Sequence, residues 1–133
     1  MAEIPEAEPH VAALKQMLVD AGLQVGVGEA PDGVAAPYVV LYPDPGLTSG
    51  TLGSLNTILT LSVQVTAVGV GAEQALQQAD RARTALLGAG MTVPGRVVHP
   101  VRAGDAQPVR RDDGVQPPLW VAIAGYTVVS DPA

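Results

Sequence analysis

The sequence offers few groups that could perform catalysis, and those few lack the spacing that catalysis needs. It has no cysteine, and its two histidines, His10 and His99, stand far apart, each without a neighbour at a metal-ligand spacing. No serine has glycine two residues before and two residues after it, as the nucleophile elbow of a hydrolase does. We therefore expect no enzymatic activity, no cofactor and no metal, and we interpret both histidines as ordinary surface or partly buried residues.

One glycine-rich turn has the position of a phosphate-binding turn. Gly69-Val70-Gly71 lies between an expected strand and an expected helix, where a nucleotide-binding fold places its phosphate loop. However, Gln74 occupies the place of the third glycine of that motif, and the preceding strand alternates between apolar and polar residues. These departures favour a purely structural turn.

Four adjacent charged residues are candidates for an interaction. Arg110, Arg111, Asp112 and Asp113 follow one another in a segment that contains glycine and several prolines. Such a cluster could form a local ion-pair turn, or it could contact a second subunit. The second interpretation makes these four residues candidate interface residues.

Hydrophobic periodicity predicts the elements that position these groups. From Leu59 to Val68 the sequence alternates, which predicts a strand whose apolar face carries Leu59, Leu61, Val63, Val65 and Ala67. The other face carries Thr60, Ser62, Gln64 and Thr66, which we expect to meet solvent or a partner. From Ala72 to Leu87 apolar residues recur at helical spacing, which predicts an amphipathic helix lying on the apolar face of the strand.

The remaining elements complete one small domain, residues 1–133. A helix is predicted from Pro9 to Ala21, and further strands are predicted over residues 37–42, 96–102 and 119–129. We expect residues 43–57 and 104–118 to be long loops, and residues 1–7 and 130–133 to be loose termini. This order predicts an α+β fold, with a mainly antiparallel sheet of four to five strands and two amphipathic helices packed on one face.

Charge is unevenly distributed along the chain, whose formal net charge is −6. Residues 1–80 contain nine acidic residues and one basic residue, whereas residues 81–133 contain four acidic and six basic residues. The acidic balance argues against a dedicated nucleic-acid binder. The acidic N-terminus is not typical of a signal peptide, and the longest apolar run, residues 119–129, is too short to span a membrane, so we expect a soluble protein made in a cytoplasm.

The long loops are the segments that we expect to meet a partner, since loops of this length in a small domain are commonly functional. The loop over residues 43–57 contains three leucines, Leu47, Leu52 and Leu55, and we expect it to become ordered only on assembly. Trp120, at the start of the last strand, is a further candidate for a subunit contact. Mobile loops without any partner are the alternative.

The layout of residues 8–130 resembles that of the tail terminator proteins of siphophages. The resemblance rests on the N-terminal amphipathic helix, the Pro37-Tyr38-Val39-Val40-Leu41-Tyr42 strand followed by a long loop, and the Leu59–Thr66 strand that runs into the helix from Ala72 to Leu87. It also rests on the ending from Arg110 through Trp120 to Val129. Tail-completion and head-tail connector proteins share much of the same fold.

The resemblance implies a non-enzymatic virion protein at the head-proximal end of a phage tail. It implies a homohexameric ring that caps the tail tube, stops its polymerisation and presents a surface to the head-tail connector protein, while DNA passes through the lumen without specific binding. The candidate contact residues would then join neighbouring copies. Two alternatives stay open: a head-tail connector or tail-completion protein, and a small α+β ligand-binding or regulatory domain.

Overall fold

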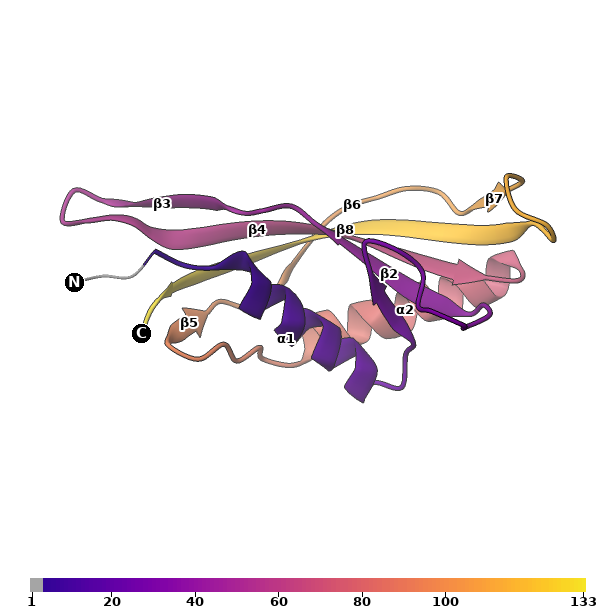
Figure 1. Ribbon diagram of the computed structural model, residues 1–133, viewed down its shortest axis with the longest axis horizontal. Helices are drawn as coiled ribbons and strands as arrows, with labels where there is room; N and C mark the ends of the chain where they lie inside the picture. Colours follow the sequence, from indigo (N-terminus) through magenta and orange to yellow (C-terminus); the bar gives the residue numbers. More distant parts are fainter. Residues whose placement is uncertain (1–3) are drawn as a thin grey trace.

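The computed structural model describes residues 4–133 as two helices lying on one face of an eight-stranded sheet (Figure 1). The elements in chain order are α1 (Ala7–Asp20), β1 (Val25–Val27), β2 (Tyr38–Pro43), β3 (Leu47–Thr51), β4 (Ser54–Gly69), α2 (Ala72–Gly88), β5 (Arg96–Val98), β6 (Arg102–Ala106), β7 (Arg110–Asp112) and β8 (Leu119–Pro132). Neither helix in this part of the chain has the length and apolar character needed to cross a membrane.

The two longest strands, β4 and β8, form the antiparallel centre of the sheet, in register from Leu59 opposite Ser130 to Gly69 opposite Trp120. Strands β2 and β3 follow one another along the other edge of β4, and β5, β6 and β7 follow one another along the outer edge of β8. Strand β1 pairs with β2 in parallel. The α+β class with both helices on one face is confirmed. The sheet, however, has eight strands, because proline- and glycine-containing breaks divide two of its five rows, and it is mixed because β1 is parallel to β2.

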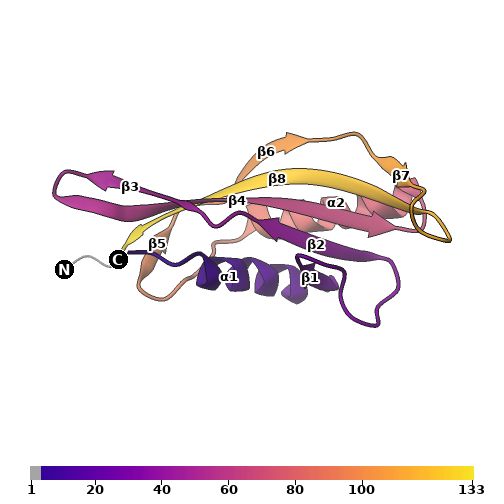
Figure 2. The same cartoon turned by 45° about the horizontal axis from the view of Figure 1, so that its top comes forward.

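The expected loop over residues 43–57 is mostly a β-hairpin, made by β3 and the first residues of β4 (Figure 2). The carboxylate of Asp44 accepts hydrogen bonds from the N–H groups of Gly46 and Ser62, at 2.9 and 3.1 Å, which ends β2 and turns the chain into β3. Gly46 has φ +84°, and a Cβ there would lie 2.6 Å from a methyl carbon of Leu59. The turn thus requires glycine, and the Leu and Thr residues after it resume a strand.

The arginine-rich half also contains more strand than expected. The predicted strand 96–102 is divided at His99–Val101, and the predicted loop 104–118 contains the end of β6 and all of β7. Both differences follow from pairing with β8, which organises short segments that have little strand propensity alone.

The expected loose C-terminus is wrong, whereas the described N-terminal residues 4–6 lie outside any helix or strand. Strand β8 continues to Pro132 and buries Ser130 completely, and helix α1 begins at Ala7. For residues 1–3 the expectation lies outside the described part of the chain.

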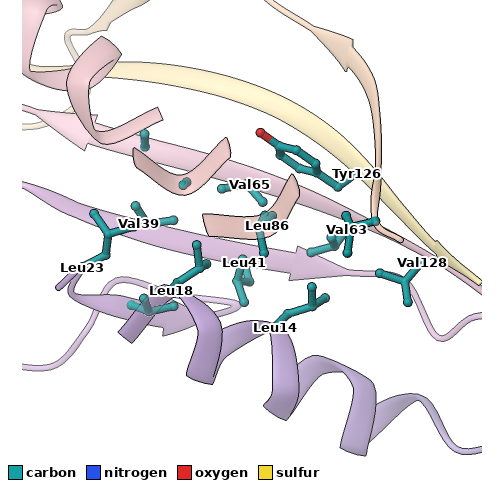
Figure 3. Close-up of a cluster of buried hydrophobic side chains, with 14 of the residues drawn as sticks. Leu14, Leu18, Leu23, Val39, Leu41, Val63, Val65, Leu86, Tyr126 and Val128 are labelled. Atoms are coloured by element: carbon teal, nitrogen blue, oxygen red, sulfur yellow. The ribbon is translucent and has the colours of Figure 1, made fainter. Parts of the chain in front are cut away.

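The core lies between the helices and the sheet, and Figure 3 shows its central side chains. Leu14 and Leu18 of α1 and Leu86 of α2 are fully buried against Leu41 of β2 and the apolar face of β4. All five residues predicted for that face of β4 are buried, which confirms the alternation. Each buried leucine or valine stabilises the fold by about 1.5–3 kcal/mol relative to an exposed one.

Candidate functional site

The face of the sheet opposite the helices is not covered by any element in residues 4–133 (Figure 2). The predicted polar row of β4 lies on this open face, where Thr60, Ser62, Gln64 and Thr66 stand opposite residues Val129, Thr127, Gly125 and Ile123 of β8. Ser62 and Gln64 are exposed, Thr60 is half-buried and Thr66 is buried. The row therefore becomes more enclosed toward the C-terminal end of β4.

At that end the open face is hollowed into a groove of about 530 Å³. We call this hollow the open-face groove. Its floor is formed by uncharged side chains of three neighbouring strands, β2, β4 and β8: Tyr38, Val40, Gln64, Thr66, Val68, Val121 and Ile123. Its rim contains Ala30 and the segment from Arg110 to Val115. The groove therefore combines an uncharged floor of apolar and polar side chains with charges at its edge.

The charged cluster predicted as an interface lies on this rim, and it is also a local ion-pair turn. The Arg111 guanidinium lies 2.6 Å from the carboxylate of Asp113, and both side chains are more than half exposed. The Asp112 carboxylate accepts a hydrogen bond of 2.9 Å from the N–H of Gly114. An ion pair this exposed contributes about 0–1 kcal/mol to stability, so the cluster is held more by the β7–β8 pairing than by its charges.

The three leucines predicted as contact residues lie at the opposite end of the molecule, on the hairpin of residues 47–58 (Figure 1). Leu47, Leu52 and Leu55 are 73%, 98% and 64% exposed. β4 is registered to β8 only from Leu59 onward, so the hairpin projects beyond the paired part of the sheet. A large apolar surface that nothing covers indicates an interaction site.

Trp120 lies apart from both groups. It precedes the groove residue Val121 on β8, so its side chain lies on the helix-covered face, where it is half-buried against the core. The predicted contact residues therefore divide into the groove and its rim, the hairpin, and one core-side residue. Gln64 and Thr66 of the polar row line the same groove as the charged cluster, whereas Thr60 and Ser62 lie outside it.

Sequence reasoning missed a buried polar network that joins α1, β5 and β8. Nδ1–H of His10 donates to the carbonyl of Glu6, and Nε2 of His10 accepts from the Ser130 hydroxyl, both at 2.7 Å. Arg96 donates from Nε to Oγ of Ser130, at 3.2 Å, and from Nη2 to the carbonyls of Thr57 and Ser130, both at 2.7 Å. The network therefore fixes the base of the hairpin at Thr57 to the end of β8.

The expected exposure of His10 is wrong, because the side chain is 1% exposed. Burial lowers the pKa of His10, the hydrogen bond to Glu6 opposes this, and the nearby charge of Arg96 lowers it further. The residue lies one and two helical repeats before Leu14 and Leu18, a spacing that was a usable signal for burial. The Ser130–His10 contact resembles part of a hydrolytic triad, but Ser130 is fully buried, so the contact is structural.

The other groups considered for chemistry, His99 and the Gly69–Gly71 turn, have ordinary structural surroundings. His99 is exposed and lies 2.7 Å from the carboxylate of Asp131. In the Gly69–Gly71 turn, the N–H of Val70 donates to the side chain of Gln74, so the residue in place of the third glycine closes the turn. Within residues 4–133, no group of three His, Cys, Asp or Glu side chains could hold a metal ion.

Comparison with known proteins agrees with this architecture. A family model described as "Tail completion protein gp17" matches residues 8–121. A chain of the structure "Virion of native gene transfer agent (GTA) particle" has the same fold, with a TM-score of 0.67 at 18% identity, over 90% of this chain and 92% of that one. No curated protein matches the chain in sequence. The resemblance found in the sequence is thus confirmed at the level of phage tail completion: the chain belongs to the tail completion protein gp17 family and is a non-enzymatic structural protein of the phage virion tail.

Proposed function

We propose that this protein is a ring-forming tail terminator, which caps the finished tail tube and stops its polymerisation. The ring, a homohexamer, then provides the surface on which the head-tail connector protein joins the tail, and DNA passes through its lumen without specific contact. The tail tube protein, the connector protein and further copies of the chain itself are its partners.

The observation that carries this proposal is the presence of two unlike unfilled surfaces at opposite ends of one sheet. One is the uncharged hairpin with Leu47, Leu52 and Leu55, and the other is the open-face groove with its charged rim. A twofold dimer needs only one self-complementary patch, whereas a ring needs two different patches that meet head to tail. Membership of the tail completion family supports a place at the end of the tail.

A head-tail connector within the same assembly is the second candidate, and the family match favours it over a ligand-binding domain. A connector would bind the head side of the junction, whereas a terminator binds the end of the tail tube. Cosedimentation of the protein with purified tail tubes therefore separates the two. Binding at one end of each tube, with no further tube growth, is expected of a terminator.

Oligomeric state is the first measurement, by native mass spectrometry across a concentration series with negative-stain imaging of large species. Closed six-membered rings, in solution or at tube ends, are the expected result. A stable twofold dimer that does not bind tubes would overturn the proposal.

The charged rim provides the matched variants for this measurement. Reversing Arg110 and Arg111 to Glu is expected to prevent ring formation while the monomer stays folded, because both side chains are exposed and only Arg111 has a partner among the described residues. Reversing Lys15 and Arg83, two exposed cations on the helices, is the control and should leave assembly intact. Normal rings from the Arg110→Glu/Arg111→Glu variant would exclude a role for the rim.

A further inference from the structure

The hairpin of residues 47–58 has an irregular register between Ser49 and Thr51 but lacks the other features that usually protect exposed strands. Natural proteins shield an edge with charged side chains, proline, or a covering helix or loop. Here no charged residue occurs from Pro45 to Ala72, and β3 pairs only with β4. A two-stranded ribbon is marginally stable in water, so an uncharged ribbon with three exposed leucines requires a surface to cover it.

The open-face groove has the matching chemistry. Its floor carries no charged side chain, and Val121 and Ile123 are only half-buried there, whereas Val40 and Val68 are already covered within the chain. The charges at the rim are partly compensated within the chain, by the Arg111–Asp113 pair and the Asp112–Gly114 hydrogen bond. An uncharged segment can therefore enter the groove without separating a buried charge from water.

The other large surfaces match the hairpin less well. The outer side of the helices carries exposed charges such as Lys15, Asp20 and Glu73, and the free edge of β6 carries Arg102 and Asp105. Covering those charges with leucine would remove their water and supply no polar partner. Complementarity of charge thus favours the groove as the acceptor.

A copy of the chain cannot fill its own groove. Leu55 and the floor residue Thr66 lie on the same extended strand, eleven positions apart, which at about 3.3 Å per residue places them roughly 35 Å from each other. The hairpin also points away from the groove, beyond the end of the β4–β8 pairing (Figure 1). The occupant must therefore come from another molecule.

The geometry points to a head-to-tail contact in which the hairpin of one copy lies in the open-face groove of the next copy. Leu52 and Leu55 then rest on the floor at Val121 and Ile123, the aliphatic floor residues that keep exposed surface. This inference rests on the proposed ring and adds the identity of both halves of the subunit contact. The same contact repeats from copy to copy because each molecule has one hairpin and one groove.

Disulfide trapping between two single-cysteine variants tests this contact directly, since the natural chain has no cysteine. Leu52→Cys places a thiol at the tip of the hairpin, and Gln64→Cys places one on the groove floor. Gln16→Cys is the matched control, because Gln16 is also an exposed glutamine but lies on α1. Equal amounts of two variants are mixed under mild oxidant, free and on tail tubes, and covalent dimers are quantified.

The Leu52→Cys and Gln64→Cys mixture is expected to yield at least ten times more covalent dimer than the Leu52→Cys and Gln16→Cys mixture. Because disulfide formation makes each encounter permanent, covalent dimers accumulate even from a weak contact. The expected difference in yield can therefore be measured even if the protein starts as a monomer. Equal yields from the two mixtures, at every concentration and on tubes, would overturn the inference. Rings that assemble normally without this cross-link would overturn the contact between hairpin and groove but leave the proposed ring intact. If the protein formed no ring and bound no tubes, the proposed function itself would be overturned.

A second variant separates docking from chance collision. Leu55→Asp, added to the Leu52→Cys protein, is expected to reduce trapping to Gln64→Cys at least tenfold, because a charge would enter the uncharged floor. Leu76→Asp is the control, as Leu76 is an exposed leucine on α2, and it should leave trapping unchanged. Unchanged trapping by the Leu55→Asp protein would contradict the apolar contact.

Discussion

The two halves of β4 have similar sequences but different surroundings. From Leu59 to Gly69 the strand is paired on both edges, and its apolar residues are covered by α2. From Ser54 to Ile58 it is paired only with β3, and Leu55 is 64% exposed. One half thus completes a core within the chain, whereas the other half leaves Leu55 with nothing in the described chain to pack against.

The difference shows that apolar residues alone do not locate the core of a subunit that works in an assembly. Neither half contains a charged residue, and both mix aliphatic with small or uncharged polar residues. The two halves differ in their neighbour on the β8 side of the sheet. β8 pairs with β4 only from Leu59 onward, so Ser54–Ile58 has a neighbouring strand, β3, on one side alone. Substitutions in the two halves should therefore affect different properties.

The largest effect on stability is expected for Leu61→Ala, in the covered half. Leu61 is fully buried, and removing a buried leucine side chain costs about 2–5 kcal/mol in the free energy of unfolding. Leu55→Ala, in the uncovered half, should change it by less than about 0.5 kcal/mol. Chemical denaturation followed by Trp120 fluorescence measures both variants, and equal losses would contradict the proposed division of β4.

The next effect concerns the network that fixes the base of the hairpin. Ser130→Ala leaves Nε2 of His10 without its donor and Nε of Arg96 without its acceptor, in a site where His10 is buried and Arg96 is half-buried. Leaving such groups unsatisfied costs about 1–3 kcal/mol. Ser62→Ala, an exposed serine on the open face, is the control and should be nearly neutral. Amide exchange near Thr57 should also become faster in the Ser130→Ala protein alone.

The same network predicts a dependence on pH. Burial lowers the pKa of His10 below its ordinary value of 6.5, so the unfolded chain takes up a proton at a higher pH than the folded protein does. The free energy of unfolding should therefore decrease as the pH falls below about 6.5, until the folded protein is protonated as well. Denaturation at several pH values tests this. His10→Gln should remove the effect, His99→Gln should retain it, and an identical pH profile for His10→Gln and the natural chain would contradict the assignment.

The smallest effect is expected at the rim of the groove. Asp113→Asn removes the partner of Arg111, but an exposed ion pair contributes only about 0–1 kcal/mol. Unfolding of this variant should be almost unchanged, and any change should decrease in high salt. A loss similar to that of Ser130→Ala would mean that the rim contributes to the fold, and not only to contacts.

The sequence predicted those features that depend on local periodicity. The alternation of β4 and the helical spacing from Ala72 identified the buried face and its covering helix, because side-chain direction follows directly from backbone geometry. Features that depend on pairing between distant segments were missed. Strands β6 and β7 are held by β8, and the hydrogen bond between His10 and Ser130 joins residues 120 positions apart. The candidate site was predicted only in part for the same reason. Its individual residues could be chosen from the sequence, but their division between hairpin and groove depends on the register of β4 with β8.

The long register between β4 and β8 also has a mechanical consequence. Eleven consecutive residue pairs join the two strands, and the hairpin is a direct extension of β4 beyond them. A tension applied to the hairpin along the strand axis would load all these hydrogen bonds together, in shear, instead of opening them one at a time. The clamp of Arg96 on the carbonyls of Thr57 and Ser130 lies where that load enters the sheet. The subunit is thus best able to bear a load that runs along its two longest strands.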